Sequence, residues 1–165
     1  MDLVFSSTTQ LATAIRTGRV SATEVLQAHL AQIARHNPAV NAIITMDSEH
    51  PLERARQADA ALARRELWGP LHGVPFTLKD AHATAGLRTT TGFPPLANYV
   101  PQEDSTVTAR LKAAGGILIG KTNVPMMRLI FNAQIPFLVA PTTPGTMSAR
   151  LAVPAAVRQR RWLVA

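Results

Sequence analysis

The sequence contains no cysteine, and this absence excludes disulfide bonds, thiolate metal sites and a cysteine nucleophile. It is typical of a protein from a reducing compartment. No hydrophobic run is long enough to span a bilayer, and the acidic Asp2 stands where a signal peptide would carry a basic patch. We therefore expect a cytoplasmic protein with no membrane partner.

Charged residues are also few, at 16% of the chain, whereas hydrophobic residues make up 47%. A chain of 165 residues with this balance can bury one compact core and is too apolar to be disordered throughout. The five histidines show no spacing typical of a metal site, so we expect neither a metal nor another cofactor.

Acidic residues are absent after Asp104, so the net charge of +7 is unevenly distributed. Residues 1–127 contain 12 basic and 10 acidic residues, whereas residues 128–165 contain five arginines and no acid. This basic segment lacks the periodic basic face and the interleaved aromatic residues that a nucleic-acid-binding surface needs. We therefore expect no nucleic-acid partner.

Three helices are predicted in the first third of the chain. Residues 9–17 form a short one that ends at Gly18, and a capping box of the form Ser-Ala-Thr-Glu at residues 21–24 begins the second. The second helix is predicted to stop at Pro38, because proline disfavours helical geometry in the residue before it. Residues 51–65, rich in Ala, Arg, Leu and Glu, form the third.

Strands are predicted at residues 42–46, 74–78 and 117–119, and a helix at residues 105–114 lies between the last two. The short apolar run at 74–78 is typical of a strand buried on both faces. The order strand, connection, helix, strand predicts an α/β fold with a parallel pair, and residues 84–101 form a loop.

The segment Gly-Pro-Leu-His-Gly-Val-Pro-Phe-Thr-Leu-Lys-Asp, residues 69–80, places Lys79 at the end of the strand at 74–78. A lysine there either extends its ammonium into water or is desolvated and acts as a base. The position alone favours the first interpretation.

Together with its neighbours, this segment resembles the amidase signature family of serine hydrolases. The resemblance runs from about Leu11 to Met127 and includes a Thr-Gly-Pro loop at 89–95, the helix at 105–114 and the Gly-Lys-Thr-Asn-Val-Pro motif at 120–125. It implies an α/β fold in which N-terminal helices precede part of a mixed, partly parallel sheet, with the rest of the family's fold missing.

The family hydrolyses carboxylic amides through a relay of a lysine, a serine in a cis peptide and a nucleophilic serine, and Lys79 matches the lysine. The resemblance implies a small-molecule amide as substrate and no cofactor. Lys121 either supports the wall of the same site or is a salt-bridged surface lysine. Asp80 is interpreted as a turn or capping residue and His72 as a loop histidine.

Two serine-containing elements of the family are absent from the sequence. These are a Gly-Gly-Ser-Ser-Gly-Gly stretch and a later Gly-Gly-Ser that carries the nucleophile, and the surroundings of Ser148 match neither. We therefore expect residues 1–127 to be the N-terminal portion of an amidase domain and residues 128–165 to be an aberrant, poorly packed basic tail. Without the serine loop, Lys79 should face a water-filled gap, and the chain should be catalytically inactive.

The tail composition is explained by a frameshift near Arg128. Codons permitted for residues 151–157, read in another frame, encode Gly-Gly-Ser-Ser-Gly-Gly, and the residues from Arg128 onward give further family-like sequence. An internal deletion is the rival, because residues 136–144 faintly resemble a segment near the family's carboxyl end. The alternative functions are an amidase-like subunit of a tRNA-dependent amidotransferase and a non-catalytic remnant or interaction module.

Overall fold

The computed structural model describes residues 2–124, so the predicted tail at residues 128–165 lies outside the described residues. None of the helices in the described part is long and apolar enough to cross a membrane. The elements follow in the order α1 (Thr8–Arg16), α2 (Ala22–Val40), β1 (Ile43–Met46), α3 (Pro51–Ala63), β2 (Pro75–Lys79), the 3-10 helix η1 (Pro94–Leu96), α4 (Thr106–Ala113) and β3 (Ile117–Thr122).

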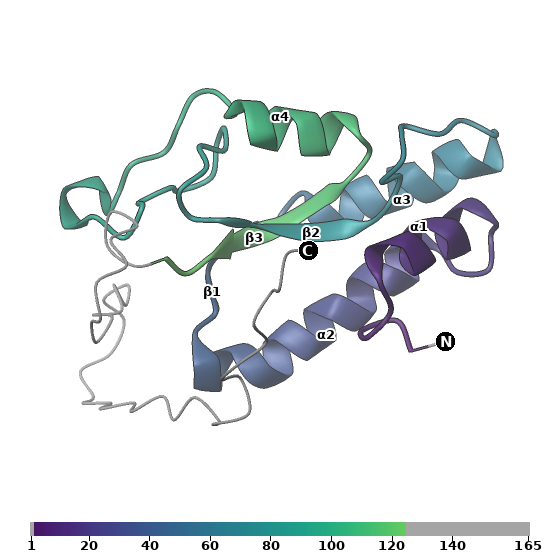
Figure 1. The fold of residues 1–165 in the computed structure, drawn as a ribbon, viewed down its shortest axis with the longest axis horizontal. Coiled ribbons are helices and arrows are strands. Elements are labelled where there is room, and N and C mark those ends of the chain that lie inside the picture. Colours follow the sequence, from purple (N-terminus) through teal and green to yellow (C-terminus); the bar gives the residue numbers. More distant parts are fainter. Residues whose placement is uncertain (1, 125–165) are drawn as a thin grey trace, which may run out of the picture.

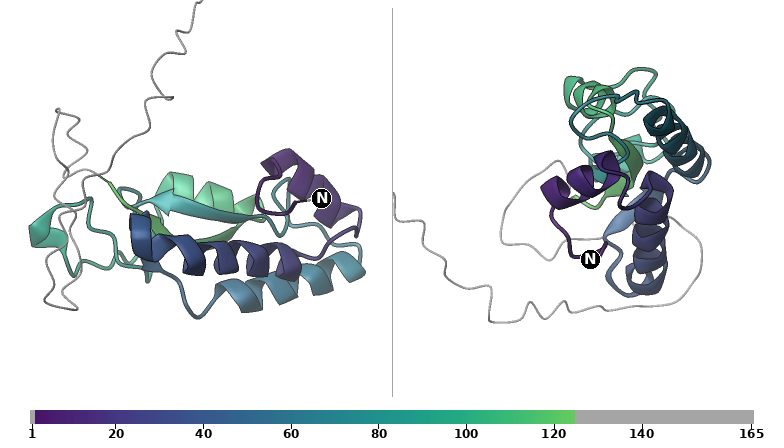
Figure 2. Two further views of the ribbon diagram at one scale, coloured as in Figure 1. Left: turned by 90° about the horizontal axis from the view of Figure 1, so that it is seen from below. Right: turned by 90° about the vertical axis from the view of Figure 1, so that its right-hand side faces the viewer.

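The strands of the described part form one mixed sheet in the order β1-β3-β2, with β3 in the centre. β1 pairs with β3 antiparallel, and β2 pairs with β3 in parallel, which confirms the predicted α/β arrangement. Helix α4 lies on one side of the sheet, and α1 and α2 lie on the other (Figures 1 and 2). Gly120 of β3 allows β1 to approach closely, because a Cβ atom there would collide with the carbonyl oxygen of Thr45.

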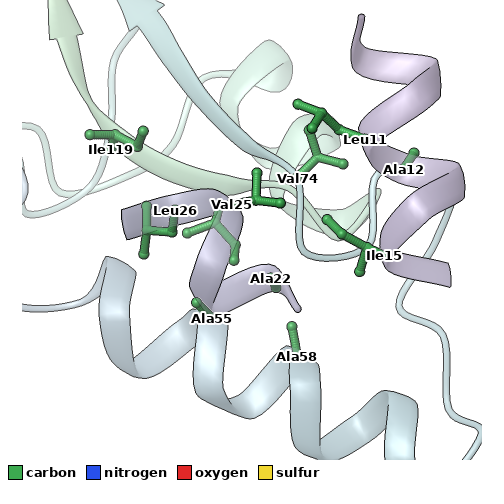
Figure 3. Close-up of a cluster of buried hydrophobic side chains, with 11 residues drawn as sticks. Leu11, Ala12, Ile15, Ala22, Val25, Leu26, Ala55, Ala58, Val74 and Ile119 are labelled. Atoms are coloured by element: carbon green, nitrogen blue, oxygen red, sulfur yellow. The ribbon is translucent and has the colours of Figure 1, made fainter. Parts of the chain in front are cut away.

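The hydrophobic core lies between the sheet and helices α1, α2 and α3 (Figure 3). Val25 and Leu26 of α2 are fully buried, and burial of each such side chain contributes about 1.5–3 kcal/mol. Ala55 and Ala58 are the small residues through which α3 meets this core. The full set is Leu11, Ala12, Ile15, Ala22, Val25, Leu26, Ala55, Ala58, Val74, Ile117 and Ile119.

The predicted capping box at the start of α2 is confirmed. The hydroxyl of Ser21 accepts a hydrogen bond from the Glu24 backbone, and the Glu24 carboxylate accepts one from the Ser21 backbone. The carboxylate of Asp59 on α3 also accepts bonds from the backbone of Ala22 at 2.6 Å and of Thr23 at 3.1 Å. This contact fixes α3 at the amino end of α2, where unpaired N–H groups favour an anion.

The predicted end of α2 at Pro38 is wrong, because the helix continues to Val40. Pro38 lies in the last turn, where its missing N–H group removes only one helical hydrogen bond. The Asn37 side chain both donates to and accepts from the backbone of Ile43, at 2.8 Å in each case. These bonds and the left-handed Asn41, with φ of 46°, end the helix and direct the chain into β1.

The prediction that residues 74–78 are buried on both faces is also wrong. Within β2 only Leu78 is buried, whereas Pro75 and Phe76 are half-buried and Thr77 and Lys79 are exposed. β2 is an edge strand of the described sheet, and the central β3 is the strand buried almost throughout. A short apolar run does not distinguish an edge strand from a central one.

Candidate active site at the carboxyl end of the parallel strands

Lys79 is the last residue of β2 and pairs in register with Thr122, the last residue of β3. The carboxyl ends of two parallel strands therefore meet at this edge of the sheet, a common place for ligand sites in α/β folds. The turn that begins β2 requires glycine at position 73, where φ is +74° and a Cβ atom would lie 2.7 Å from that of Ala22.

Strand alternation sends Lys79 and its neighbours in opposite directions. Lys79 is exposed, whereas Leu78 before it is 5% exposed and Asp80 after it is fully buried. Among the described residues, no hydrogen bond or ion pair involves the Lys79 side chain. Its amine is therefore accessible on the outer side of the strand end, while the next carboxylate points into the protein.

Asp80 is anchored inside the protein by Thr90. One carboxylate oxygen, Oδ2, accepts hydrogen bonds from the Thr90 backbone N–H at 2.9 Å and from the Thr90 hydroxyl. The Asp80 backbone carbonyl also accepts from the Thr91 N–H at 2.8 Å. The interpretation of Asp80 as a turn residue therefore missed its main contact, which joins β2 to a loop ten residues later.

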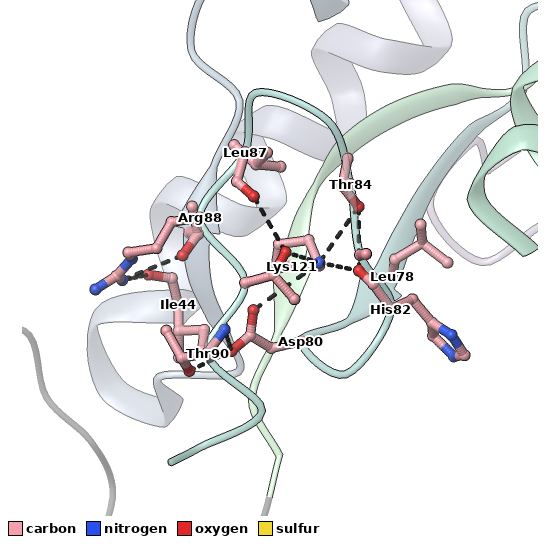
Figure 4. A network of polar contacts seen from close by, with 12 residues as sticks. Ile44, Leu78, Asp80, His82, Thr84, Leu87, Arg88, Thr90 and Lys121 are labelled. Atoms are coloured by element: carbon pink, nitrogen blue, oxygen red, sulfur yellow. Dashed lines mark hydrogen bonds and ion pairs between the residues drawn. The ribbon is translucent and has the colours of Figure 1, made fainter. Parts of the chain in front are cut away.

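Lys121 of β3 is fully buried, so its interpretation as a salt-bridged surface lysine is wrong. Its ammonium donates to the backbone carbonyl of His82, to the Thr89 hydroxyl at 2.8 Å and to the Thr84 hydroxyl at 3.3 Å (Figure 4). The Nζ atom lies 3.9 Å from Oδ1 of Asp80. Lys121 thus joins β3 to the loop that follows Lys79.

Burial lowers the pKa of Lys121 from its ordinary value of 10.5 to about 8, and the nearby carboxylates of Asp80 and Asp104 oppose this shift. The ammonium therefore stays charged at neutral pH. Its three N–H groups have three oxygen acceptors, and the Asp80 carboxylate adds an ion pair at 3.9 Å.

His72 lies in the turn before β2, as predicted for a loop histidine, and is 2% exposed. Its Nδ1 accepts from the Trp68 backbone at 3.1 Å, so Nε2 carries the proton and donates to the Ala58 carbonyl at 3.1 Å. Burial lowers the pKa of His72. These contacts hold the turn against α3, and the described residues contain no cluster of three metal-ligating side chains.

The threonines Thr84, Thr89 and Thr90 are the members of this site that sequence reasoning missed. They lie in a segment whose many Thr, Gly and Pro residues indicated only a loop. Two signals were available: alternation from the buried Leu78 places Asp80 inside, and the apolar run of β3 continues into Lys121. A buried Asp and a buried Lys on neighbouring strand ends require nearby hydrogen-bonding partners.

Comparisons with known proteins agree with this arrangement. The family model described as Amidase matches residues 24–148. The A subunit of the glutamyl-tRNA(Gln) amidotransferase from Acidothermus cellulolyticus is 43% identical over 123 residues, which cover 74% of this chain and 24% of that protein. An acylamidase from Rhodococcus erythropolis is 37% identical over 124 residues, which cover 75% of this chain and 26% of that protein.

A solved structure, native peptide amidase from Stenotrophomonas maltophilia, is similar with a TM-score of 0.67 and 31% identity. The similarity covers 74% of this chain and 25% of that one. The chain therefore spans about a quarter of the length of these relatives. The family match continues past Met127, where the sequence predicts the end of the amidase portion, to Ser148.

Proposed function

The chain belongs to the amidase family, and we propose that it carries the lysine of an amide-hydrolysing site, with Lys79 as the base. The observation that carries this proposal is the place of Lys79 within a Gly-Val-Pro-Phe-Thr-Leu-Lys-Asp motif, at the carboxyl end of β2 beside β3. Its accessible amine supports the role, because a base must reach groups outside its own strand.

In the proposed reaction, the neutral amine of Lys79 takes the proton of a bridging serine, which takes the proton of a nucleophilic serine. The nucleophile's oxygen then attacks the amide carbonyl, the C–N bond breaks, and the amine product leaves with the relayed proton. Water hydrolyses the resulting acyl-enzyme and releases the carboxylic acid. Backbone N–H groups of a glycine-rich loop stabilise the oxyanion.

We further propose that residues 1–165 do not complete this site by themselves. No Gly-Gly-Ser-Ser-Gly-Gly stretch and no Gly-Gly-Ser element occur in the sequence, so both serines of the relay are missing. The accessible Lys79 amine therefore has no serine from which to take a proton. The 165-residue chain is expected to be inactive for this reason.

A fluorophosphonate probe, which labels activated serines covalently, tests this incompleteness. We expect no labelling of the 165-residue chain, while a known serine hydrolase in the same sample is labelled. Labelling of any serine in this chain, located by peptide mass spectrometry, would show that it holds an activated nucleophile and would overturn the proposal.

The origin of the chain is proposed to be a frameshift near Arg128. The permitted Gly-Gly-Ser-Ser-Gly-Gly codons support it, whereas the family match that continues to Ser148 favours the rival internal deletion, because out-of-frame residues carry no family pattern. The coding DNA decides between them. Codons for residues 151–157 that cannot encode the shifted stretch would exclude the frameshift.

Restoring the shifted frame, with the downstream nucleophile region, tests the role of Lys79. We expect the restored protein to hydrolyse a simple carboxylic amide, and Lys79→Ala to lower kcat by at least about 100-fold, as for loss of a general base. The matched control is Lys112→Ala on α4, which should leave kcat within about twofold of the restored protein. Full activity without Lys79 would show that it is not the base.

The second candidate within the class is an amidase-like subunit of an amidotransferase. The observation that favours it is the 43% identity to the A subunit of an amidotransferase, against 37% to an acylamidase. Glutamine hydrolysis that appears only when partner subunits are added to the restored protein would support this candidate. Hydrolysis of simple amides by the restored protein alone would support the amidase.

A further inference from the structure

We infer that Lys121 is a positioning residue for Lys79: its buried ammonium fixes the loop that follows Lys79, and this loop holds the Lys79 main chain at the strand end. The inference rests on the proposed function of Lys79 as the base. It assigns a role to a group that the proposed relay does not use.

The ammonium of Lys121 occupies an oxygen cage, which consists of the His82 carbonyl and the hydroxyls of Thr84 and Thr89. All three oxygens come from the loop that follows Lys79, whereas Lys121 itself comes from β3. Figure 4 shows the His82 carbonyl and the Thr84 hydroxyl directed toward Nζ, with the His82 imidazole directed away from it. One charge therefore organises eight consecutive loop residues, 82–89.

The hydroxyls in the cage are themselves oriented by the loop. The Thr84 hydroxyl lies 3.3 Å from the His82 carbonyl and the Thr89 hydroxyl 3.1 Å from the Leu87 carbonyl, and each donates its proton there. Their lone pairs therefore remain free to accept from Lys121. The three cage oxygens are all paired only while a hydrogen-bond donor occupies the centre of the cage.

Asp80 provides the second connection between Lys121 and the strand end. Its Oδ2 is bound to Thr90, whereas its Oδ1 is buried and has no hydrogen-bond partner among the described residues. Within residues 2–124 the nearest cation to Oδ1 is the Lys121 ammonium at 3.9 Å, and at zero exposure the attraction between them is little screened. Lys121 thus attracts the residue next to Lys79 while binding the loop beyond it.

Three backbone hydrogen bonds transmit this order to Lys79. The Asp80 N–H donates to the Thr122 carbonyl at 2.9 Å, and the His82 N–H donates to the Lys79 carbonyl at 3.1 Å. The Thr91 N–H donates to the Asp80 carbonyl at 2.8 Å. The sheet holds Lys79 on one side through its pairing with Thr122, and the cage holds its other side by fixing His82.

The hydrogen-bond donors of Lys121, and not only its volume, are required. Methionine has a similar length and fills the same space, but it donates no hydrogen bond to the cage and leaves the Asp80 carboxylate without its cation. Lys121→Met therefore separates the two contributions. Lys112→Met is the matched control: Lys112 of α4 pairs with Asp104 at 2.8 Å and donates nothing to the cage. Asp104 can keep its hydrogen bond from the Ala85 N–H at 2.8 Å without Lys112.

The test is hydrogen exchange of the 165-residue chain by NMR, read at the N–H groups of Asp80, His82 and Thr91. We expect Lys121→Met to accelerate exchange at these three groups at least tenfold, with amides of α2 within twofold of the unmodified chain. The Lys79 side-chain 13Cε–1Hε signal should shift as well. Lys112→Met should change neither. Unchanged exchange at the three groups, or equal acceleration in α2, would overturn the inference.

Two further measurements keep the inference testable if Lys121→Met fails to fold. In the unmodified chain, the 15Nζ signal of Lys121 should persist at pH 6, because the cage slows its exchange with water; its absence would contradict the cage. Thr89→Val removes one acceptor and keeps the charge, and it should accelerate exchange at the same groups several-fold. None of these readouts depends on catalysis. The inference about Lys121 can therefore be refuted while the restored enzyme confirms Lys79 as the base, and the role of Lys79 can be refuted while the inference about Lys121 holds.

Discussion

A double-mutant cycle on Asp80 and Lys121 gives the sharpest test of how the buried polar cluster stabilises the fold. Both side chains have zero exposure, and their charged atoms lie 3.9 Å apart. Lys121→Met leaves a buried carboxylate without its cation and the cage without a donor, which typically costs about 3–5 kcal/mol. Because the ammonium is itself desolvated, we expect a value near the lower end, about 3 kcal/mol.

The second single variant, Asp80→Asn, should lower the free energy of unfolding by less than Lys121→Met. In Asp80→Asn the amide oxygen can still accept from Thr90, and Lys121 keeps its three oxygen acceptors, so we expect a cost of about 1–3 kcal/mol. The double variant contains no unpaired buried charge. Its cost should therefore be smaller than the sum of the single costs, by roughly 2 kcal/mol, within the range observed for residues in direct contact.

The Lys112–Asp104 pair provides an internal comparison. Its separation of 2.8 Å is shorter, but the side chains are 39% and 20% exposed. Solvent screening limits such pairs to about 1 kcal/mol or less, so the closer pair should show the smaller coupling. Burial of the side chains, and not the distance between the charged atoms, therefore decides which pair has the larger coupling energy.

Urea unfolding at pH 7, followed by far-UV circular dichroism, measures all the variants on one scale. A coupling below about 0.5 kcal/mol between Asp80 and Lys121 would mean that their effects are additive, and the reasoning from burial would be refuted. A larger coupling for Lys112 and Asp104 than for the buried pair would refute it equally.

Three further outcomes are expected. Above about pH 8 the unfolded chain binds more protons at Lys121 than the folded one, so the free energy of unfolding should rise with pH up to about pH 10.5, and Lys121→Met should lack this rise in urea titrations. Asp59→Ala removes the acceptor at the start of α2 and should cost about 1–2 kcal/mol, whereas an unchanged unfolding midpoint would show that the contact with Ala22 contributes nothing. Gly120→Ala places a methyl group against the Thr45 carbonyl and should cost at least about 2 kcal/mol in the same assay.

Local chemistry in the sequence predicts most of the described elements. The glycine at position 18, the Ser21 capping box and the apolar runs of the strands mark helix ends and strands because each depends on residues only a few positions apart. The end of α2 was misplaced because it depends on contacts of Asn37 with Ile43, which no local rule contains.

In the candidate site, too, the features set by neighbouring residues were predictable and those set by distant contacts were not. The motif around Lys79 was predictable because its residues are contiguous, and the parallel pairing of β2 with β3 followed from the helix between them. The oxygen cage was not predictable, because Lys121 meets His82, Thr84 and Thr89 across 32 to 39 residues of sequence. The burial of Lys121 also depends on β3 being the central strand, which an apolar run alone does not establish.

The order of the strands also has a consequence for synthesis on the ribosome. The central strand β3 is the last of the described strands in the sequence, and about 70 residues separate it from the end of β1. At synthesis rates of 5–20 residues per second, β1 remains without its sheet partner for roughly 4–14 s. During that time the nascent chain holds α1, α2 and α3 and two unpaired strands. Residues 117–122 therefore set the earliest moment at which the sheet can assemble.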